Sequence, residues 1–249
     1  EHCLYLDSRV QADRFRTRLL NHCLRVSRAM MNDPTANEQV RIAIVGGGAT
    51  GVELAAELYN AAGALRHYGL EVFDESRLHV TLLEAGPRIL PALPEKLAAA
   101  ASHELGVLGV QVRPDVQVVE ARPRQLITKT GEVIEADLIV WAAGVKGADY
   151  LSGLGLETNS RNQILVTDTL QTTVDPSIFA LGDVTDRVQL TPVAIHEAMC
   201  FIETEYKNNP TSPDHGLIAT AVFSQPEVGT VGISESEARK LHGEIDIYK

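Results

Sequence analysis

Three glycines in the segment GGGATG, residues 46–51, form the pattern with the clearest chemical meaning in this sequence. The segment follows the apolar run at 40–45 and precedes a stretch of helical character. In a strand–turn–helix unit, Gly46 allows a tight turn, Gly48 lets a pyrophosphate approach the backbone, and Gly51 lets helix and strand pack closely. The free N–H groups at the start of the helix favour phosphates. The pattern therefore predicts a dinucleotide site, against the alternative of a glycine-rich turn without a ligand.

Two glutamates extend this hypothesis. Glu84 ends a predicted second strand, where its carboxylate would bind both hydroxyls of an adenosine ribose and repel the 2′-phosphate of NADP, which favours NAD. The 38-residue separation from Gly46 exceeds the usual ~20, and an insertion at residues 60–78 would explain it. The alternative is an ordinary surface acid. Glu53 lies in the first turn of the predicted helix, where it would face the nicotinamide or merely complement the helix dipole.

A second composite pattern lies near residue 180. The apolar segment SIFALGD, residues 177–183, delivers Asp183 past a predicted strand end, a position suited to a ribityl or ribose hydroxyl. Capping of the following segment is the alternative. Thr191 and Pro192 then begin a predicted helix, whose N-terminus would stabilise negative charge on a reduced ring.

The remaining reactive side chains predict no further centre. Cys3, Cys23 and Cys200 are too scattered for a disulfide framework or a zinc site, which fits a reducing cytoplasm and predicts no metal. Three histidines share no ligand spacing and are interpreted as ordinary helix or loop side chains: His196, His215 and His242.

Composition narrows the class of protein. The 249 residues include 22 Lys and Arg against 33 Asp and Glu, a formal charge of −11, and 45% are hydrophobic. This acidic balance argues against nucleic-acid or anionic-membrane partners, which require a basic face. No apolar run reaches the ~18 residues of a membrane span, and the first residues do not form a secretory signal. We expect a soluble cytoplasmic α/β protein.

Periodicity predicts the elements that would position these residues. Ser8 and Gln11 cap a helix whose apolar stripe runs to Met30. Further strands and helices are predicted at 40–45, 50–65, 79–84, 94–108, 116–121, 125–128, 133–134 and 137–141. This order indicates a Rossmann-like domain, a parallel sheet with a β-meander insert.

The pattern changes beyond residue 147. Short strands are predicted at 164–167 and 178–181, a helix from Pro192, and a hairpin within 217–232. Ser234 and Glu237 predict the cap of one more helix.

Longer segments resemble known families. IAIVGGGATGVELAAEL, VTLLEAGPRILPALPEKL, ADLIVWAAGVKG and IFALGDV resemble the type II NADH dehydrogenases, within the pyridine nucleotide–disulfide oxidoreductase superfamily of flavoproteins, over residues 1 to about 186. From about residue 182, LTPVAIHEAMCFIETEY and IATAVFSQPEVGTVGISESEA resemble glutathione reductases. Because both resemblances meet at the shared LGDV, the sequence is interpreted as chimeric and truncated.

The resemblance implies roles for individual residues. NADH would be held by four residues: Gly46, Gly48, Gly51 and Glu84. Ala143 and Gly144 would lie beside its nicotinamide half, and Glu53 would be the catalytic residue between nicotinamide and flavin. FAD would be held by Gly182, Asp183 and Thr191.

The resemblance also implies four parts. These are a leading helix and linker (1–37), an NADH-binding Rossmann-like domain (38–147), a partial FAD-binding domain (148–210) and the start of an α+β interface domain (211–249). That last part makes a homodimer one option.

The expected function is hydride transfer from NADH to FAD and on to quinone in the complete enzyme. The alternatives are a glutathione-reductase-like disulfide reductase and a non-catalytic NAD-binding fragment. The unit that grips the ADP half of FAD, the redox cysteine pair and the membrane-anchoring helices of these families are absent from this sequence. The FAD site is therefore expected to be incomplete, and the chain alone inactive. Members of the NADH dehydrogenase family lie peripherally on the cytoplasmic membrane face.

Overall fold

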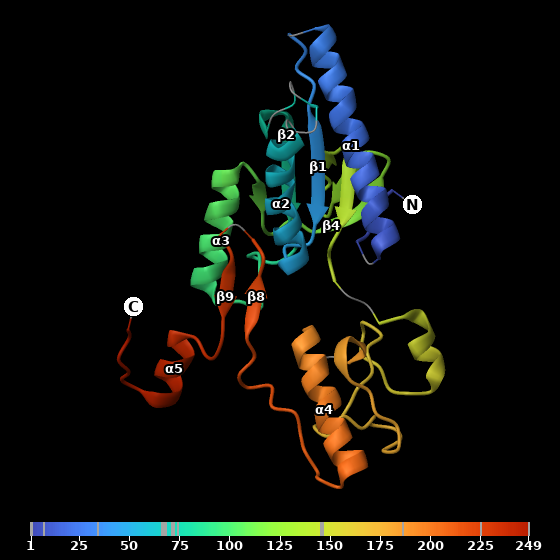
Figure 1. The fold of residues 1–249 in the computed structure, drawn as a ribbon, viewed down its shortest axis with the longest axis vertical. Helices are drawn as coiled ribbons and strands as arrows, with labels where there is room; N and C mark the ends of the chain where they lie inside the picture. Colours follow the sequence, from blue (N-terminus) through green and yellow to red (C-terminus); the bar gives the residue numbers. More distant parts are fainter. Residues whose placement is uncertain are drawn as a thin grey trace. The chain divides into compact units, whose positions relative to one another are not determined.

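The computed structural model describes residues 2–6, 8–33, 35–65, 69–70, 73, 75–144, 147–185, 187–224 and 226–248. The chain forms two compact units, whose helices and strands are drawn in Figure 1. The first unit comprises Glu1–Ala143 and Ala221–Val228, and the second comprises Gly144–Thr220 and Gly229–Lys249.

A four-stranded parallel sheet with the order β3-β2-β1-β7 forms the centre of the first unit. Its strands are β1 (Val40–Val45), β2 (Leu78–Leu83), β3 (Gln111–Arg113) and β7 (Leu138–Trp141). In β1 every side chain except that of Arg41 is buried. A central strand covered on both faces requires such a continuous apolar run, so the α/β fold with a parallel sheet is confirmed.

The side chains of β1 divide the first unit into layers. Ile42 and Ile44 pack into a core with the helices α1 (Arg9–Asn32), α2 (Ala49–Leu65) and α3 (Glu95–Leu108), which lie across one face of the sheet (Figure 1). Ala43 and Val45 belong to a second core on the opposite face. Successive side chains of a strand point to opposite faces, so one six-residue strand joins both cores.

The second core is closed by the expected insert. Strands β4 (Val118–Arg122), β5 (Gln125–Thr128) and β6 (Val133–Glu135) form an antiparallel sheet in the order β4-β5-β6. Leu126 of β5 is fully buried in this core. The predicted β-meander is therefore confirmed.

Two additions to the parallel sheet were not predicted. Strand β3 pairs with β2 although its three residues carry two polar side chains. Leu4 forms a single parallel bridge with Val140: its N–H donates to Ile139 O at 2.8 Å, and its carbonyl accepts from Trp141 N at 2.8 Å. Both segments are too short to show a strand periodicity.

The second unit has less regular structure than predicted. Four isolated β-bridges replace the strands expected at 164–167 and 178–181, which corrects that prediction. The hydrogen-bonded partners of these segments change after a single residue, so no ladder extends. Between residues 144 and 220 the helical elements are η3 (Asp149–Leu154), η4 (Gly182–Val184) and α4 (Thr191–Lys207), of which α4 matches the predicted helix.

The later elements follow the predicted order. Strands β8 (Thr220–Val222) and β9 (Val228–Thr230) form the expected hairpin, and α5 (Glu235–His242) follows it. Ser234 and Glu237 form the predicted capping box. A short 3-10 turn, η2 (Glu75–Arg77), precedes β2. None of the helices in the described ranges is long and apolar enough to cross a membrane.

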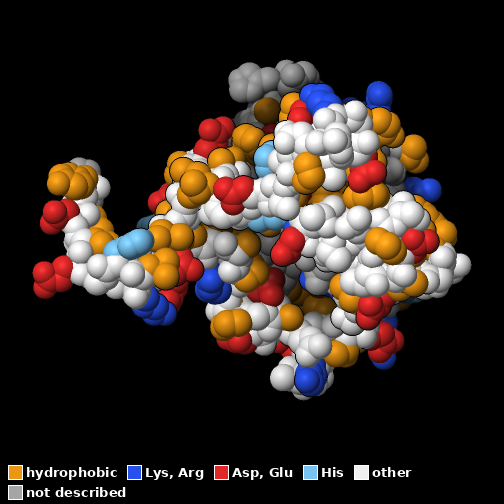
Figure 2. All heavy atoms as spheres, turned by 90° about the horizontal axis from the view of Figure 1, so that it is seen from below, with side chains coloured by type: hydrophobic (Ala, Val, Ile, Leu, Met, Phe, Trp, Pro, Cys, Tyr) orange, Lys and Arg blue, Asp and Glu red, His pale blue; other side chains and the backbone are white. Residues whose placement is uncertain are grey.

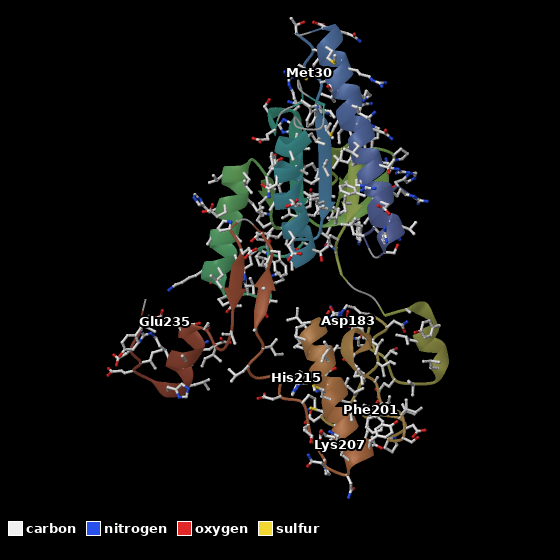
Figure 3. The ribbon with its side chains drawn as sticks, in the orientation of Figure 1. Met30, Asp183, Phe201, Lys207, His215 and Glu235 are labelled. Atoms are coloured by element: carbon white, nitrogen blue, oxygen red, sulfur yellow. The ribbon has the colours of Figure 1, made fainter. Side chains whose placement is uncertain are left out.

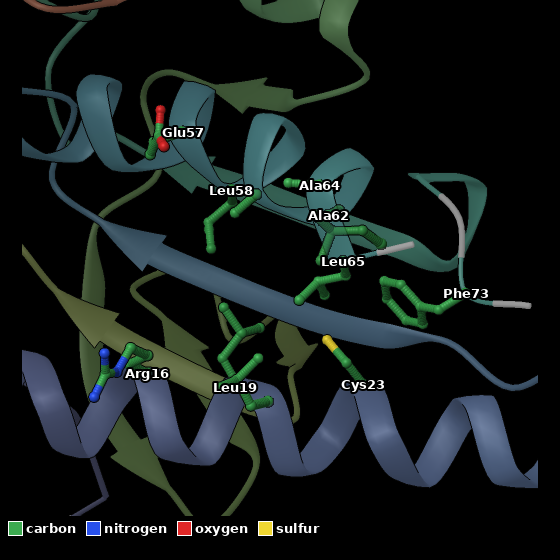
Figure 4. Close-up of a pocket in the computed structure, with 12 residues that line it drawn as sticks. Arg16, Leu19, Cys23, Glu57, Leu58, Ala62, Ala64, Leu65 and Phe73 are labelled. Atoms are coloured by element: carbon green, nitrogen blue, oxygen red, sulfur yellow. The ribbon is translucent and has the colours of Figure 1, made fainter. Parts of the chain in front are cut away.

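A cavity of about 360 Å³ lies between α1 and α2. Figure 4 shows Leu19 and Cys23 of α1 facing Leu58 and Leu65 of α2 across it. Burial raises the pKa of the Cys23 thiol to about 11. At neutral pH this side chain is therefore a protonated apolar group.

This burial predicts a difference in reactivity among the three cysteines. Cys3 is half-buried, whereas Cys23 and Cys200 are buried, and burial is also the main cause that raises the pKa of Cys200. We expect Ellman's reagent at pH 8 to label one thiol of the native protein rapidly and the other two only after denaturation. The fast phase should disappear in Cys3→Ser. A fast phase that survives this substitution would contradict the burial of the other two thiols.

Candidate functional site

The turn between β1 and α2 requires glycine at two positions. Gly46 has φ +115, and a Cβ there would lie 2.6 Å from Ala143 N, two residues after the end of β7. A Cβ on Gly51 would lie 2.0 Å from Gly46 O. Both contacts are with backbone atoms, so a side chain at either position would force the strands and helix apart.

The Cβ position of Gly48 has free space around it, in contrast to those of Gly46 and Gly51. No atom lies within 4 Å of the Cβ position at Gly48. Helix α2 begins at the next residue, and Val52 N donates to Gly48 O at 3.1 Å. The open space therefore lies at the start of a 17-residue helix, where unpaired N–H groups favour an anion.

The carboxylate of Glu84 joins two loops at this edge of the sheet. One oxygen, Oε2, accepts from Gly47 N at 2.7 Å, and the other, Oε1, accepts from Gly86 N at 2.7 Å. Each carboxylate oxygen has a further lone pair, so both can accept a second donor such as a ribose hydroxyl. The structure thus fixes Glu84 directly beside the glycine turn, despite the long sequence separation.

The arginines near Glu84 are engaged elsewhere. Arg88 donates to the carbonyls of Leu90, Pro91 and Leu93, with its closest contact at 2.8 Å to Leu93 O. Arg113 makes two hydrogen bonds of 2.8 Å to the carboxylate of Glu132, which raises the pKa of the arginine. The charge of Glu84 is therefore not paired with either of them.

Glu53 contacts the hairpin, which the sequence did not indicate. Its Oε1 accepts from Phe223 N at 2.8 Å, across 170 residues of sequence. The neighbouring Val222 is buried in the main core of the first unit. Glu53 is thus bound to a backbone N–H and is more than a helix-dipole partner. No motif or periodicity near either residue predicts this contact.

The second unit brings together Gly182, Asp183 and the start of α4. Gly182 has φ +70, and its Cβ position lies 3.1 Å from the side chain of Ala194. Asp183 is exposed in η4, and Thr191 is exposed as the first residue of α4. Asp183 therefore lies in a turn that packs against α4, and its role at a flavin stays a prediction.

A buried carboxylate fixes this turn. Glu197 of α4 is 1% exposed, and its Oε2 accepts from Gly182 N at 2.7 Å. Its Oε1 lies 2.9 Å from His215 Nε2, and Figure 3 shows His215 beside α4. His215 was interpreted as an ordinary loop histidine, whereas the structure pairs it with the residue that holds Gly182.

Other predicted positions are placed as follows. Ala143 ends the first unit, and its carbonyl accepts from Trp141 Nε1 at 3.1 Å. Gly144 begins the second unit with φ +74. Residues 145 and 146, and part of the insertion expected at 60–78, lie outside the described residues. In the described ranges, no three His, Cys, Asp or Glu side chains gather in a group that could hold a metal ion.

Comparison with known proteins places this geometry in a family. Residues 8–198 match the model of the pyridine nucleotide-disulphide oxidoreductase family. A type II NADH:quinone oxidoreductase from Haemophilus influenzae is 50% identical over 200 residues, which cover 76% of this chain and 45% of that protein. A glutathione reductase from Burkholderia cepacia is 34% identical over 84% of this chain and 44% of its own length.

Solved structures agree with this assignment. An HOCl-induced flavoprotein disulfide reductase from Escherichia coli, in its Cu(II) complex, gives a TM-score of 0.63 at 25% identity, covering 80% of this chain and 44% of that one. Reduced Bacillus anthracis CoADR-RHD gives 0.65 at 21% identity over 97% of this chain and 40% of its own, which shows the fold alone. The chain spans about 45% of the length of the curated relatives named above. With its glycine turn, parallel sheet and antiparallel insert, the chain belongs to the pyridine nucleotide-disulphide oxidoreductase family.

Proposed function

We propose that this chain is the NADH-binding part, with one side of the flavin site, of an NADH:quinone oxidoreductase. The observation that carries the proposal is the open space at Gly48 beside the fixed carboxylate of Glu84. The first accommodates a pyrophosphate at the start of α2, and the second accepts the hydroxyls of the adenosine ribose. The family binds FAD and a nicotinamide cofactor, which supports this assignment.

Some residues of the chain would bind the cofactors, and others would position them. Backbone N–H groups at the start of α2 bind the phosphates, and Glu84 orients the adenosine half of the cofactor. Glu53, held by Phe223 N, fixes the position of a negative charge on the nicotinamide side. In the second unit, Asp183 would accept a ribityl hydroxyl, and the start of α4 would stabilise negative charge on the flavin. When bound, FAD supplies the acceptor for the hydride.

The choice of quinone over a disulfide rests on similarity. The NADH:quinone oxidoreductase is 50% identical and the glutathione reductase 34% identical, over comparable shares of this chain. A non-catalytic NAD-binding fragment remains the alternative of a different class. The first two experiments below test cofactor binding, and the third tests the acceptor.

Gly48→Val tests the pyrophosphate site directly. The side chain would extend into the open space at the start of α2, where no atom lies within 4 Å of the Cβ position. We expect NADH affinity, measured by calorimetric titration, to fall at least about tenfold, or ~1.4 kcal/mol, with an unchanged circular dichroism spectrum.

The matched control is Gly106→Val. Gly106 lies in α3, also with no atom within 4 Å of its Cβ position, so the same substitution adds the same volume away from the turn. It should leave NADH affinity unchanged. Wild-type affinity in Gly48→Val would exclude the turn as the dinucleotide site.

Glu84 predicts a preference for NADH over NADPH. The 2′-phosphate would lie beside a carboxylate whose neighbouring arginines are bound to other groups. Two like unit charges about 4 Å apart repel each other by ~1 kcal/mol in water and by ~4 kcal/mol near a protein surface, so we expect NADPH to bind at least about tenfold more weakly. Calorimetric titration of both cofactors measures this ratio, and equal affinities would refute the assigned role of Glu84.

One side of a flavin site is not expected to retain FAD, so the acceptor is tested with the complete, FAD-loaded enzyme to which we assign this chain. NADH is supplied together with a soluble quinone in one assay and with glutathione disulfide in the other, and its absorbance at 340 nm is followed. We expect NADH oxidation that depends on the quinone. Oxidation that depends on the disulfide would instead favour the glutathione-reductase type, and no oxidation with either would favour the non-catalytic fragment.

A further inference from the structure

A hollow of about 420 Å³ lies against α1 at the amino end of β7. Six residues line it: Arg18, Asn21, His22, Arg25, Asp137 and Leu138. Leu138 is the first residue of β7, whereas the glycine turn follows the last residue of β1. Since β1 and β7 are parallel, the hollow and the proposed dinucleotide site lie at opposite ends of the sheet.

Arginines outnumber carboxylates around this hollow. Asp137 has a side chain only 5% exposed, and it forms ion pairs with Arg124 and, at 3.7 Å, with Arg25. Its other oxygen, Oδ2, accepts from Arg41 N at 2.9 Å. The guanidinium group of Arg41 is paired with Glu135 at 3.3 Å, so it adds no net charge here. Arg18 and Arg25 line the hollow together with Asp137, whereas Arg124 pairs with Asp137 from outside it. Counted together, these three arginines and one carboxylate leave an excess of two positive charges.

The excess of positive charge around the hollow is confined to one part of a protein that is acidic as a whole. The whole sequence carries a formal charge of −11, and acidic side chains are scattered over the face drawn in Figure 2. Helix α1, in contrast, contains six arginines and a single acid, Asp13. The chain thus concentrates positive charge on one helix, where its own carboxylates neutralise only part of it.

Arg124 occupies a backbone conformation that favours glycine. It follows Pro123 in the two-residue loop between β4 and β5, with φ +60. Proline followed by a residue of positive φ is typical of a type II turn, in which glycine is preferred at this position. This conformation costs free energy for a non-glycine residue, and it places the side chain of Arg124 against Asp137 beside the hollow.

His22 lines the hollow beside Arg18 and Arg25. Its pKa is lowered by burial and by Arg25, Arg124 and Arg18, an effect that Asp137 only partly offsets. Its Nδ1 is buried and has no hydrogen-bond partner among the described residues. An anion in the hollow would compensate these arginines and raise the pKa of His22.

We propose that this hollow binds a phosphoryl dianion, either free phosphate or the terminal group of a phosphomonoester. A dianion matches the excess of two positive charges, and guanidinium groups bind phosphate oxygens in pairs with charge-assisted hydrogen bonds. Arg18 and Arg25 are exposed on α1 and lie seven residues, or two turns, apart on one face. Asn21 adds an amide donor from the same face.

The test uses the histidine ring resonances of the whole chain in NMR spectra without cofactor. The His22 signal is assigned by its absence in His22→Gln. Inorganic phosphate, titrated at constant ionic strength, should shift this signal in a saturable manner and raise the pKa of His22, whereas chloride should do neither. Methyl phosphate in a second titration distinguishes the two sources, because a monoester site would bind it at least as tightly as inorganic phosphate.

Three variants distinguish binding in the hollow from general attraction to α1 and from binding at the glycine turn. Arg25→Gln should weaken phosphate binding at least about tenfold, as expected for a lost charge-assisted hydrogen bond. Arg28→Gln removes the same charge from α1 at a residue that does not line the hollow, and it should change the affinity less than about twofold. Gly48→Val should leave the His22 response unchanged, because the glycine turn lies at the other end of the strands.

Three results would overturn the proposal. A His22 response that is equal for phosphate and chloride would show screening of a basic helix only. An equal loss in Arg25→Gln and Arg28→Gln would show attraction to α1 as a whole. Loss of the response in Gly48→Val would place the phosphate at the dinucleotide site. The unchanged resonances of the other histidines confirm that each variant is folded.

Discussion

The two hydrogen bonds of the Glu84 carboxylate join the loops that surround the candidate dinucleotide site. A partly buried carboxylate is costly unless its oxygens are satisfied, and here each oxygen accepts a backbone N–H at 2.7 Å. The same contact ties the glycine turn to the loop after β2, which is also joined by Leu90 N donating to Gly47 O at 2.7 Å. Glu84 is thus both a structural clamp and the candidate ribose ligand.

This clamp works because the strands bring their carboxyl ends to one edge. Gly46 N donates to Leu83 O, and Ala142 N donates to Val45 O, so β2, β1 and β7 continue their pairing into the loops. The absent side chains of Gly46 and Gly51 let these loops and α2 approach closely. The alternating burial of β1 then holds this edge between the helices and the antiparallel insert.

The parts of the fold that the sequence predicts are those with a local signal. The apolar run of β1, the glycine spacing and the capping residues Ser8 and Ser234 each act within a few residues, and the corresponding elements are present. Strand β3 and the bridge at Leu4 lack such a signal because they are defined by their partner strands. The prediction of strands in the second unit was wrong because it considered only the local apolar pattern. Without a partner strand that continues alongside, such a segment forms only single bridges.

The side-chain contacts at the candidate sites depend even more on long-range folding. Glu53 and Phe223 are 170 residues apart in the sequence. Glu197 and His215 come into contact because the segment after α4 runs back along that helix. The cluster around Asp137 combines α1, β7 and the turn at Arg124, so a formal charge of −11 gave no indication of it. Net charge excludes a uniformly basic surface but does not report a local one.

The central claim is that NADH binds along the glycine turn with its ribose at Glu84. Backbone amide NMR spectra of the whole chain, recorded during a titration with NADH, test it most directly. We predict the largest saturable shifts at Gly47 and Gly48, at the first residues of α2, and at Gly86, whose N–H reports on the Glu84 carboxylate. Saturable shifts confined to residues outside this edge of the sheet, or no shifts at all, would contradict this claim.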